Sequence, residues 1–435
     1  MQIKPAVLKT TDAGFEARLT KLTAWESVSD ISRQTRVAEI IEAVRSEGDE
    51  ALLRLTRELD ENYVDSASDL VLDAPALEDA FRELSDSLKI ALSTARDRIW
   101  AFHEAQKEAS WRLPEKDDGI LLGQEVRPMS RVGLYVPGGK ATYPSSVLMN
   151  AIPAKVAGVP LIQMVVPAPK GELNPIVLAA AHLAEVDRVV TIGGAQAVAA
   201  LAHGTDTVLP VDKIVGPGNS WVANAKRQVF GKVGIDMIAG PSEILVYVEP
   251  PMDPDWVAMD LFSQAEHDED AQPIFVHCDQ SFADKVHESM NRLLPTLERA
   301  SIIAKSINNR CIFIEALNRA DAIAVVNRVA PEHLELCVDD PETMLPAIQN
   351  AGAIFMGRFT PESLGDYCAG PNHVLPTSGT ARFASPLGVY DFIKRSSVIY
   401  CSNEGSKTIA DVASTLARSE GLTAHARSAE YRRDS

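Results

Sequence analysis

The chain has 435 residues, more than one ordinary hydrophobic core holds, so two or more domains are expected. Hydrophobic residues make up 46% of the chain and charged residues 23%, which is typical of a folded globular protein. The formal net charge of −18 argues against nucleic acid as a partner. The five cysteines form no C-x-x-C pair, and their odd number favours a reducing compartment over a disulfide framework.

The sequence predicts neither export nor a membrane span. The N-terminus lacks an apolar signal segment. The longest apolar region, 147–167, is interrupted by Asn150, Pro153, Lys155 and Pro160, so it cannot cross a bilayer. We therefore expect a cytoplasmic protein with no membrane partner.

The first third of the chain predicts helices. Residues 1–27 form an N-terminal helical segment with a short helix at 15–22. Apolar residues recur at helical spacing over 32–59, where Gly48 predicts a break. A further helix is predicted over 75–106.

A charged, glycine-bearing stretch, 113–123, predicts a loop after these helices. We expect the early helices to pack on the α/β unit that starts at Glu243. Residues 28–134 and 241–385 then make up a first α/β domain.

Strands and helices alternate regularly from residue 131. Because helices separate the strands, the alternation indicates a mostly parallel sheet covered on both faces. The predicted strands are 131–136, 162–166, 188–192 and 213–215, and the predicted helices are 145–157, 174–184, 195–203 and 220–230. Residues 135–240 form a second α/β domain in this interpretation.

The same alternation restarts at Glu243 and continues to about Phe355. We therefore predict an α/β fold of two Rossmann-like parallel-sheet units with additional N-terminal and C-terminal helical segments. The tail, 386–435, is expected to be helical. Its last piece, 420–432, is short and charged and buries little by itself, so it is expected to depend on a partner chain.

Three strand ends in the first unit carry glycine. They are 136–139, 192–196 and 215–219. Backbone can approach a ligand closely at such loops, and the helix that follows attracts phosphate, so a dinucleotide is one interpretation. No G-x-G-x-x-G fingerprint is present, and each glycine pair is also compatible with a simple tight turn.

The helix predicted over 255–267 ends with Gln264 and His267. These residues are three apart, so an amide oxygen and an imidazole point the same way and offer half of a metal site. Asp366 and His425 provide a carboxylate and a second imidazole elsewhere in the chain. Two nitrogen and two oxygen ligands suit zinc or a similar divalent ion.

Glu332 and His333 are adjacent after a predicted helix. In a loop both can reach one pocket, where His333 is a general base near neutral pH and Glu332 activates water. An exposed surface pair is the alternative. Of the remaining histidines, His373 alone is expected near the site, as a residue behind the ligands.

Long stretches of the chain together resemble the histidinol dehydrogenase family over nearly the whole length. The matching stretches are 132–139, 193–197, 216–219, 239–243, 263–267, 330–334, 362–366, 370–376 and 420–425. The resemblance implies oxidation of L-histidinol to L-histidine with two NAD, through an aldehyde kept in the site. It also implies a homodimer in which the C-terminal tail reaches the partner's site.

The resemblance assigns a role to each candidate residue. Glu332 and His333 are implied to be the acid–base pair. One zinc ion is implied at Gln264, His267, Asp366 and His425, and NAD at Tyr135, Gln196 and Asn219. Substrate contacts are implied for Ser242, Gln264, His267, His333, Asp366, Glu420 and His425.

Three other functions stay open from sequence. A zinc hydrolase would use the metal and Glu332 to activate water without a nucleotide, but the chain has glycine loops and no H-E-x-x-H. A family relative oxidising another amino alcohol or a sulfonated diol is the second. A non-enzymatic binding protein is the third, although it would not need Glu332 beside His333.

Overall fold

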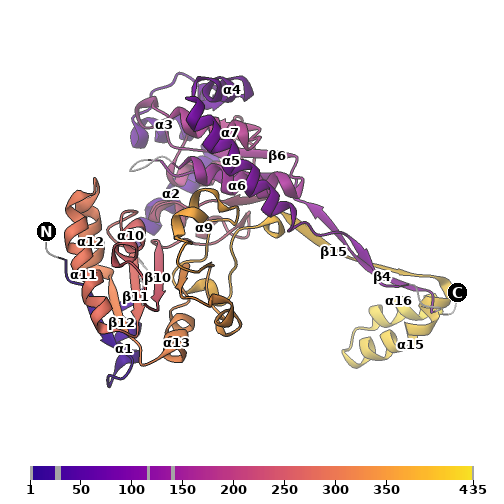
Figure 1. The fold of residues 1–435 in the computed structure, drawn as a ribbon. Coiled ribbons are helices and arrows are strands. Elements are labelled where there is room, and N and C mark those ends of the chain that lie inside the picture. The colour runs from indigo at the N-terminus through magenta and orange to yellow at the C-terminus, as the bar shows by residue number, and fades with distance from the viewer. Residues whose placement is uncertain (1–2, 25–30, 115–117, 139–142, 434–435) are drawn as a thin grey trace.

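The computed structural model describes residues 3–24, 31–114, 118–138 and 143–433. Two six-stranded sheets form its main body, and a long arm extends from it (Figure 1). Sheet I has the order β2-β7-β6-β5-β8-β9. Its strands in that order are Val71–Leu72, Arg188–Val190, Leu161–Val165, Arg131–Tyr135, Lys213–Val215 and Gly234–Ile235.

Sheet II has the order β1-β12-β11-β10-β13-β14 and all its strands are parallel. They are Ala6–Lys9, Ile312–Glu315, Gln272–His277, Glu243–Val248, His333–Cys337 and Ala353–Met356. The side chains of β10 alternate between two cores, Ile244 and Val246 on one face and Leu245 and Tyr247 on the other. A parallel strand buried on both faces requires such a continuous apolar run.

The two sheets repeat one topology. In sheet I, β5, β6 and β7 follow one another outward, and β8 and β9 lie on the other side of β5. In sheet II, β10, β11 and β12 do the same, with β13 and β14 beyond β10. This is the strand order of a doubly wound nucleotide-binding unit, which confirms the predicted fold of two Rossmann-like units.

Within the described ranges, eight helices cover sheet I. One face carries α2 (Ile31–Glu47), α3 (Asp49–Asp60), α8 (Gly194–His203) and α9 (Ser220–Val229), and the other carries α4 (Ala74–Glu83), α5 (Asp86–Glu104), α6 (Pro144–Ala157) and α7 (Pro175–Leu183). The early helices α2 to α5 thus pack on sheet I. The expectation that they join the unit after Glu243 is wrong.

The reason is that sheet II is already covered on both faces. Its flanking helices are α10 (Pro254–Ala265), α11 (Gln280–Leu293) and α12 (Ala300–Arg310) on one side, and α1 (Phe15–Leu22) and α13 (Arg319–Val329) on the other. The N-terminal segment also adds β1 to sheet II and so is not purely helical. The predicted boundary at residue 27 lies outside the described residues.

The helix predicted over 75–106 is two helices. Ser85 caps α5 by accepting a hydrogen bond from the amide of Leu88, so the chain turns between α4 and α5. The loop predicted over 113–123 is wrong in its second half, because β4 (Ile120–Pro128) pairs antiparallel with β15 (Ile393–Cys401). Strand β3 (Trp111–Arg112) pairs with the other edge of β4.

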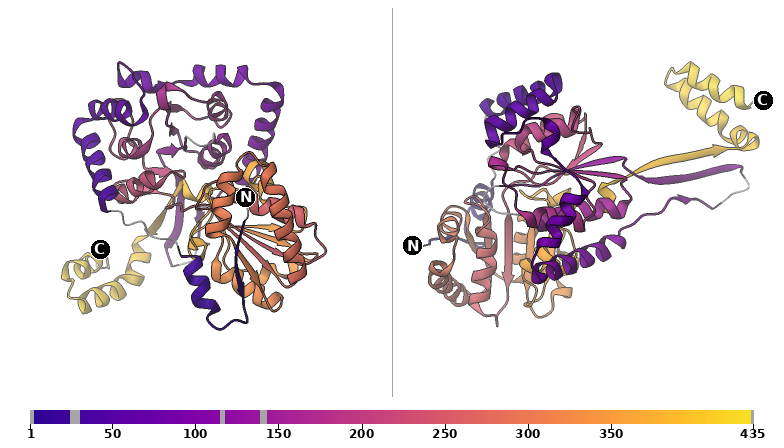
Figure 2. Two further views of the ribbon diagram at one scale, coloured as in Figure 1. Left: turned by 90° about the vertical axis from the view of Figure 1, so that its left-hand side faces the viewer. Right: turned by 90° about the horizontal axis from the view of Figure 1, so that it is seen from above.

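The β4–β15 ribbon is the arm that leaves the body. Two helices, α15 (Asn403–Ser419) and α16 (Thr423–Arg433), pack on each other at its end. Both views of Figure 2 show this pair well away from the two sheets. The predicted tail helices therefore form, but apart from the body of their own chain.

Candidate active site

The start of sheet II holds Glu332 and His333, the predicted acid–base pair. His333 begins β13, and its neighbour across the ladder is Ile244 of β10. The carboxylate of Glu332 accepts a hydrogen bond from the amide of Glu243 at 2.8 Å, and Nδ1 of His333 donates to the carbonyl of Glu243 at 2.9 Å. Glu332 is 7% exposed and His333 3%, which rules out an exposed surface pair.

The end of α10 brings Gln264 and His267 to the same edge. Asp253 caps α10 and Pro254 begins it, and the helix stops at Ala265, just before His267. The amide group of Gln264 lies 3.2 Å from Nδ1 of His267. With the Gln264 oxygen turned toward His267, its nitrogen donates to the carbonyl of Glu243 at 3.0 Å. The Ser242 hydroxyl lies 3.3 Å from the same Nδ1.

Two carboxylates face the free side of His333. Its Nε2 lies 3.4 Å from Oδ1 of Asp366 and 3.8 Å from Oε1 of Glu362. Glu362 begins the short helix α14 (Glu362–Leu364) and is 2% exposed. The sequence interpretation did not select Glu362. Its spacing from Asp366 is the sequence feature that could have identified it. Residues four apart share a face of a helical turn, and Glu362 precedes Asp366 by four.

Burial and mutual charge set the pKa values of this cluster. Burial raises the pKa of Glu332 to about 8 and that of Glu362 to about 7. Burial lowers the pKa of His333, but Glu362, Glu332 and Asp366 raise it more, and the net shift is upward. The raised pKa values mean that Glu332 and Glu362 resist ionisation at neutral pH, and a divalent cation among these groups would favour their carboxylate forms.

His373 connects this cluster to sheet I. Its Nδ1 lies 2.8 Å from the carbonyl of Asp366, and its Nε2 lies 3.4 Å from the hydroxyl of Ser146 on α6. Helix α6 follows the glycine loop after β5. The segment from Asp366 to His373 therefore bridges the start of sheet II and the first turn of α6, the helix that follows β5 of sheet I.

The glycine loops of sheet I pack closely at its carboxyl edge. A Cβ on Gly193 would lie 2.5 Å from Cβ of Pro167, and Gly216, with φ +115°, would direct one onto the carbonyl of Tyr135. The hydroxyl of Tyr135 accepts a hydrogen bond from the amide of Gly194 at 3.1 Å. The ends of β5, β7 and β8 thus meet here, with Gly193 and Gly216 buried in the packing; Gly139, named with the first loop, lies outside the described residues.

Gln196 and Asn219 occupy two helix starts at this edge. Gln196 is 1% exposed, and within the described residues its Oε1 has no hydrogen-bond partner. Asn219 caps α9, its Oδ1 accepting from the amides of Trp221 at 3.0 Å and Val222 at 3.2 Å. Tyr135, Gln196 and Asn219 thus lie along one edge of sheet I.

Glu420 and His425 do not reach the cluster of their own chain. Both are exposed, at the end of α15 and in α16. Figure 1 shows these helices across the molecule from α10 and β10. The structure therefore gathers Ser242, Gln264, His267, Glu332, His333 and Asp366 but leaves the two tail residues apart.

The buried donor atoms suit a metal ion. In the described part of the chain, Nε2 of His333 and Oδ1 of Asp366 are buried without a hydrogen-bond partner. One ligand atom each from His333, Glu362 and Asp366 lies within 4.8 Å of the others. This set shares only Asp366 with the predicted ligands, but Gln264 and His267 border it. Nitrogen and oxygen donors of this kind fit zinc.

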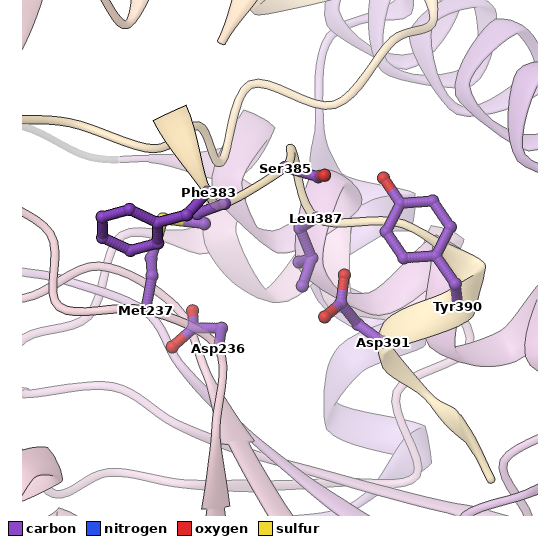
Figure 3. A pocket seen from close by; sticks show the side chains of 8 residues that line it. Asp236, Met237, Phe383, Ser385, Leu387, Tyr390 and Asp391 are labelled. Atoms are coloured by element: carbon purple, nitrogen blue, oxygen red, sulfur yellow. The ribbon is translucent and has the colours of Figure 1, made fainter. Parts of the chain in front are cut away.

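A separate cavity of about 330 Å³ lies beside sheet I and contains none of these residues. Met237 and Phe383 lie on one side of it and Tyr390 on the other (Figure 3). Its two carboxylates are already paired, Asp236 with Lys226 and Asp391 with Lys213. The cavity is therefore a poor candidate for the active site.

No helix within the described ranges is long and apolar enough to cross a membrane.

The family model of histidinol dehydrogenase matches residues 24–433 of the chain. The chain is 63% identical to a Pseudomonas aeruginosa histidinol dehydrogenase over 98% of this chain and 96% of that protein. A Methylococcus capsulatus histidinol dehydrogenase is 59% identical over 99% of both.

A crystal structure of histidinol dehydrogenase from Elizabethkingia anophelis superposes with a TM-score of 0.92 at 32% identity, covering 99% of this chain and 98% of that one. The agreement extends over both sheets and the arm, not over one unit alone. The chain belongs to the histidinol dehydrogenase family.

Proposed function

We propose that this oxidoreductase converts L-histidinol to L-histidine by two successive hydride transfers to NAD, with L-histidinaldehyde kept in the site between them. The observation that carries the proposal is the buried Glu332–His333 pair beside Gln264, His267 and Asp366. His373 links this cluster to the helix that follows a glycine loop, so substrate and nucleotide sites adjoin.

His333 is oriented to act as the base for the alcohol. Because Nδ1 donates to the carbonyl of Glu243, loss of the other ring proton leaves the lone pair on Nε2. A cation held beside Asp366 would offset the negative charges that raise the pKa of His333 and so favour the neutral ring. His333 Nε2 takes the alcohol proton as hydride leaves for NAD. The second oxidation needs an added water, and the carboxylate of Glu332, 3.7 Å from the His333 ring, takes its proton.

Gln264, His267 and Asp366 would hold zinc, with His425 of the partner subunit completing the set. Zinc would orient the imidazole and amine of histidinol, both good zinc ligands. Ser242, beside His267, and Glu420 from the tail would hold the rest of the substrate.

A homodimer with exchanged tails accounts for the arm. Apolar side chains on the arm and its helices are exposed, among them Ile399 at 71%, Tyr400 at 60%, Val412 at 61%, Leu416 at 59% and Tyr431 at 71%. Such a surface costs free energy in water and suits burial against a second copy. A two-fold dimer would carry each tail to the other subunit's site and make two equivalent composite sites.

The direct test is NADH formation from L-histidinol, with and without a chelator. We expect two NADH per L-histidine, loss of turnover on metal removal, and recovery with zinc. Full activity in metal-free protein would refute the zinc assignment. Turnover of a hydrolytic substrate without NAD would favour the zinc hydrolase instead, and a preference for another amino alcohol or a sulfonated diol would favour a relative of different specificity.

Tail exchange is tested by mixing two inactive variants, His333→Asn and His425→Asn, unfolded together and reassembled. If the tail acts on the partner, each mixed dimer has one intact site and one doubly damaged site. Random pairing makes about half of the dimers mixed, so L-histidine formation returns to about a quarter of wild type. No recovery, with mixed dimers demonstrated, would mean that each tail serves its own subunit.

A further inference from the structure

Asp60 lies at the carboxyl edge of sheet I, beside the loop after β7. It is the last residue of α3, because Glu61 takes a left-handed conformation with φ 50° and ends the helix. Helix α3 shares a core with α8, the helix that starts at Gly194. The backbone amide of Gly193 hydrogen-bonds the Asp60 carboxylate, so this acid faces the start of α8.

Two side-chain oxygens near the start of α8 lack hydrogen-bond partners within the described part of the chain. Among the described residues, Oδ2 of Asp60 is buried and has no hydrogen-bond partner, and the same is true of Oε1 of Gln196. The Gln196 oxygen folds over Gly194, since a Cβ there would lie 2.7 Å from it. Burial raises the pKa of Asp60, and the Gly193 amide opposes the shift. Two buried acceptors, one beside Gly193 and one beside Gly194, call for a ligand that donates hydrogen bonds.

The topology indicates which part of a dinucleotide would lie there. In a doubly wound unit, an acid near the end of the second strand accepts hydrogen bonds from the adenosine ribose. The second strand of sheet I is β6, and Val166, Pro167, Ala168 and Pro169 follow it without an acid. Strand β7 is the next neighbour of β6, and Asp60 stands at its end. Asp60, from α3, thus substitutes for the acid that is absent at the end of β6.

We propose that Asp60 accepts hydrogen bonds from the adenosine ribose hydroxyls of NAD and thereby selects NAD over NADP. The inference rests on the proposed use of NAD. A carboxylate only accepts hydrogen bonds, which suits a ribose diol. The 2′-phosphate of NADP brings a like charge against the half-buried carboxylate of Asp60, and that charge is repelled.

The test compares NAD and NADP in wild type and in Asp60→Asn. Binding is measured by calorimetry and turnover as kcat/KM with L-histidinol. We expect the preference for NAD over NADP to fall at least about tenfold, the size expected for one charged hydrogen bond and the repulsion removed with it. Asp65→Asn removes an exposed acid five residues further on and is the matched control, with the preference unchanged.

An equal loss with both coenzymes would mean that Asp60 only holds the Gly193 loop, and it would overturn the inference. An unchanged preference would overturn it as well. If Asp60→Asn does not fold, Asp60→Ser removes the same charge and is judged by the same ratio. Failure of wild type to reduce NAD would refute the proposed function alone, because calorimetry compares the two coenzymes without turnover.

Discussion

Sheet I and sheet II share one strand order. The candidate site lies at the carboxyl ends of the strands in sheet I but at the starts of the strands in sheet II. In sheet I, the ends of β5, β7 and β8 carry the glycine loops with Tyr135 and Gln196. In sheet II, the starts of β10 and β13 carry Glu243, Glu332 and His333. Ligands of doubly wound sheets normally bind at carboxyl ends. Sheet II departs from that rule.

The carboxyl ends of the strands in sheet II are unsuited to binding a nucleotide. The strand corresponding to β5 is β10, and Pro250 and Pro251 follow it where sheet I has glycine. Proline has no amide hydrogen for a phosphate. Glu249 at this edge is already engaged, with the hydroxyl of Tyr247 at 2.7 Å and Nε of Arg319 at 2.7 Å. Charges that satisfy one another leave little for a ligand.

The difference teaches that a repeated fold does not repeat its site. One copy supplies backbone amides at strand ends, which suit the phosphates of a dinucleotide. The other supplies buried ionisable groups at strand starts, which suit proton transfer and metal binding. Because Ser146 and His373 join the two regions, the two units would contribute complementary halves of one site under the proposed function.

The largest expected effect comes from the base at the start of sheet II. We predict that His333→Asn lowers kcat for L-histidinol about a thousandfold, since a positioned general base contributes about 10² to 10⁴. NAD binding, measured by calorimetry, should be unchanged because sheet I is untouched.

The matched control is His277→Asn, at the opposite edge of the same sheet. His277 is 1% exposed and stacks on Phe275, with ring centroids 5.2 Å apart. Its replacement should lower the unfolding free energy by roughly 1–3 kcal/mol and leave kcat nearly unchanged. A comparable loss of kcat in both variants would mean that the two edges do not differ in function.

A smaller effect separates the two oxidations. Glu332→Gln keeps the shape and removes the charge that would accept a proton from water. We predict that the rate with L-histidinaldehyde falls about a hundredfold and that the rate of the alcohol step falls far less. Single-turnover NADH formation measures each step. Equal losses in both steps would reject the separate role of Glu332.

Periodicity alone predicted most of the two units, because buried parallel strands and amphipathic helices leave strong local patterns. It did not reveal which sheet α2 to α5 cover, since an apolar helix face does not name its partner. The β4–β15 pairing was missed because its strands are far apart in sequence and mostly outside a core. Glu362 was missed although it precedes Asp366 by four residues, because the sequence does not show that this helical turn faces His333.

The smallest effect concerns the packing of the loops in sheet I. Gly193→Ala would place a Cβ against Pro167, so the loop after β7 must shift by a few tenths of an ångström or more. We predict that KM for NAD rises about tenfold, while zinc content stays at the wild-type level, because a small misplacement of a binding loop weakens ligand positioning. Gly234→Ala in β9 is the control, since its Cβ would lie 3.3 Å from its nearest neighbour, the carbonyl of Asp212, and should leave KM within about twofold. If Gly193→Ala bound NAD as wild type does, close packing of the strand-end loops would not be what fits sheet I to the nucleotide, and the contrast with the proline-bearing edge of sheet II would lose its physical basis.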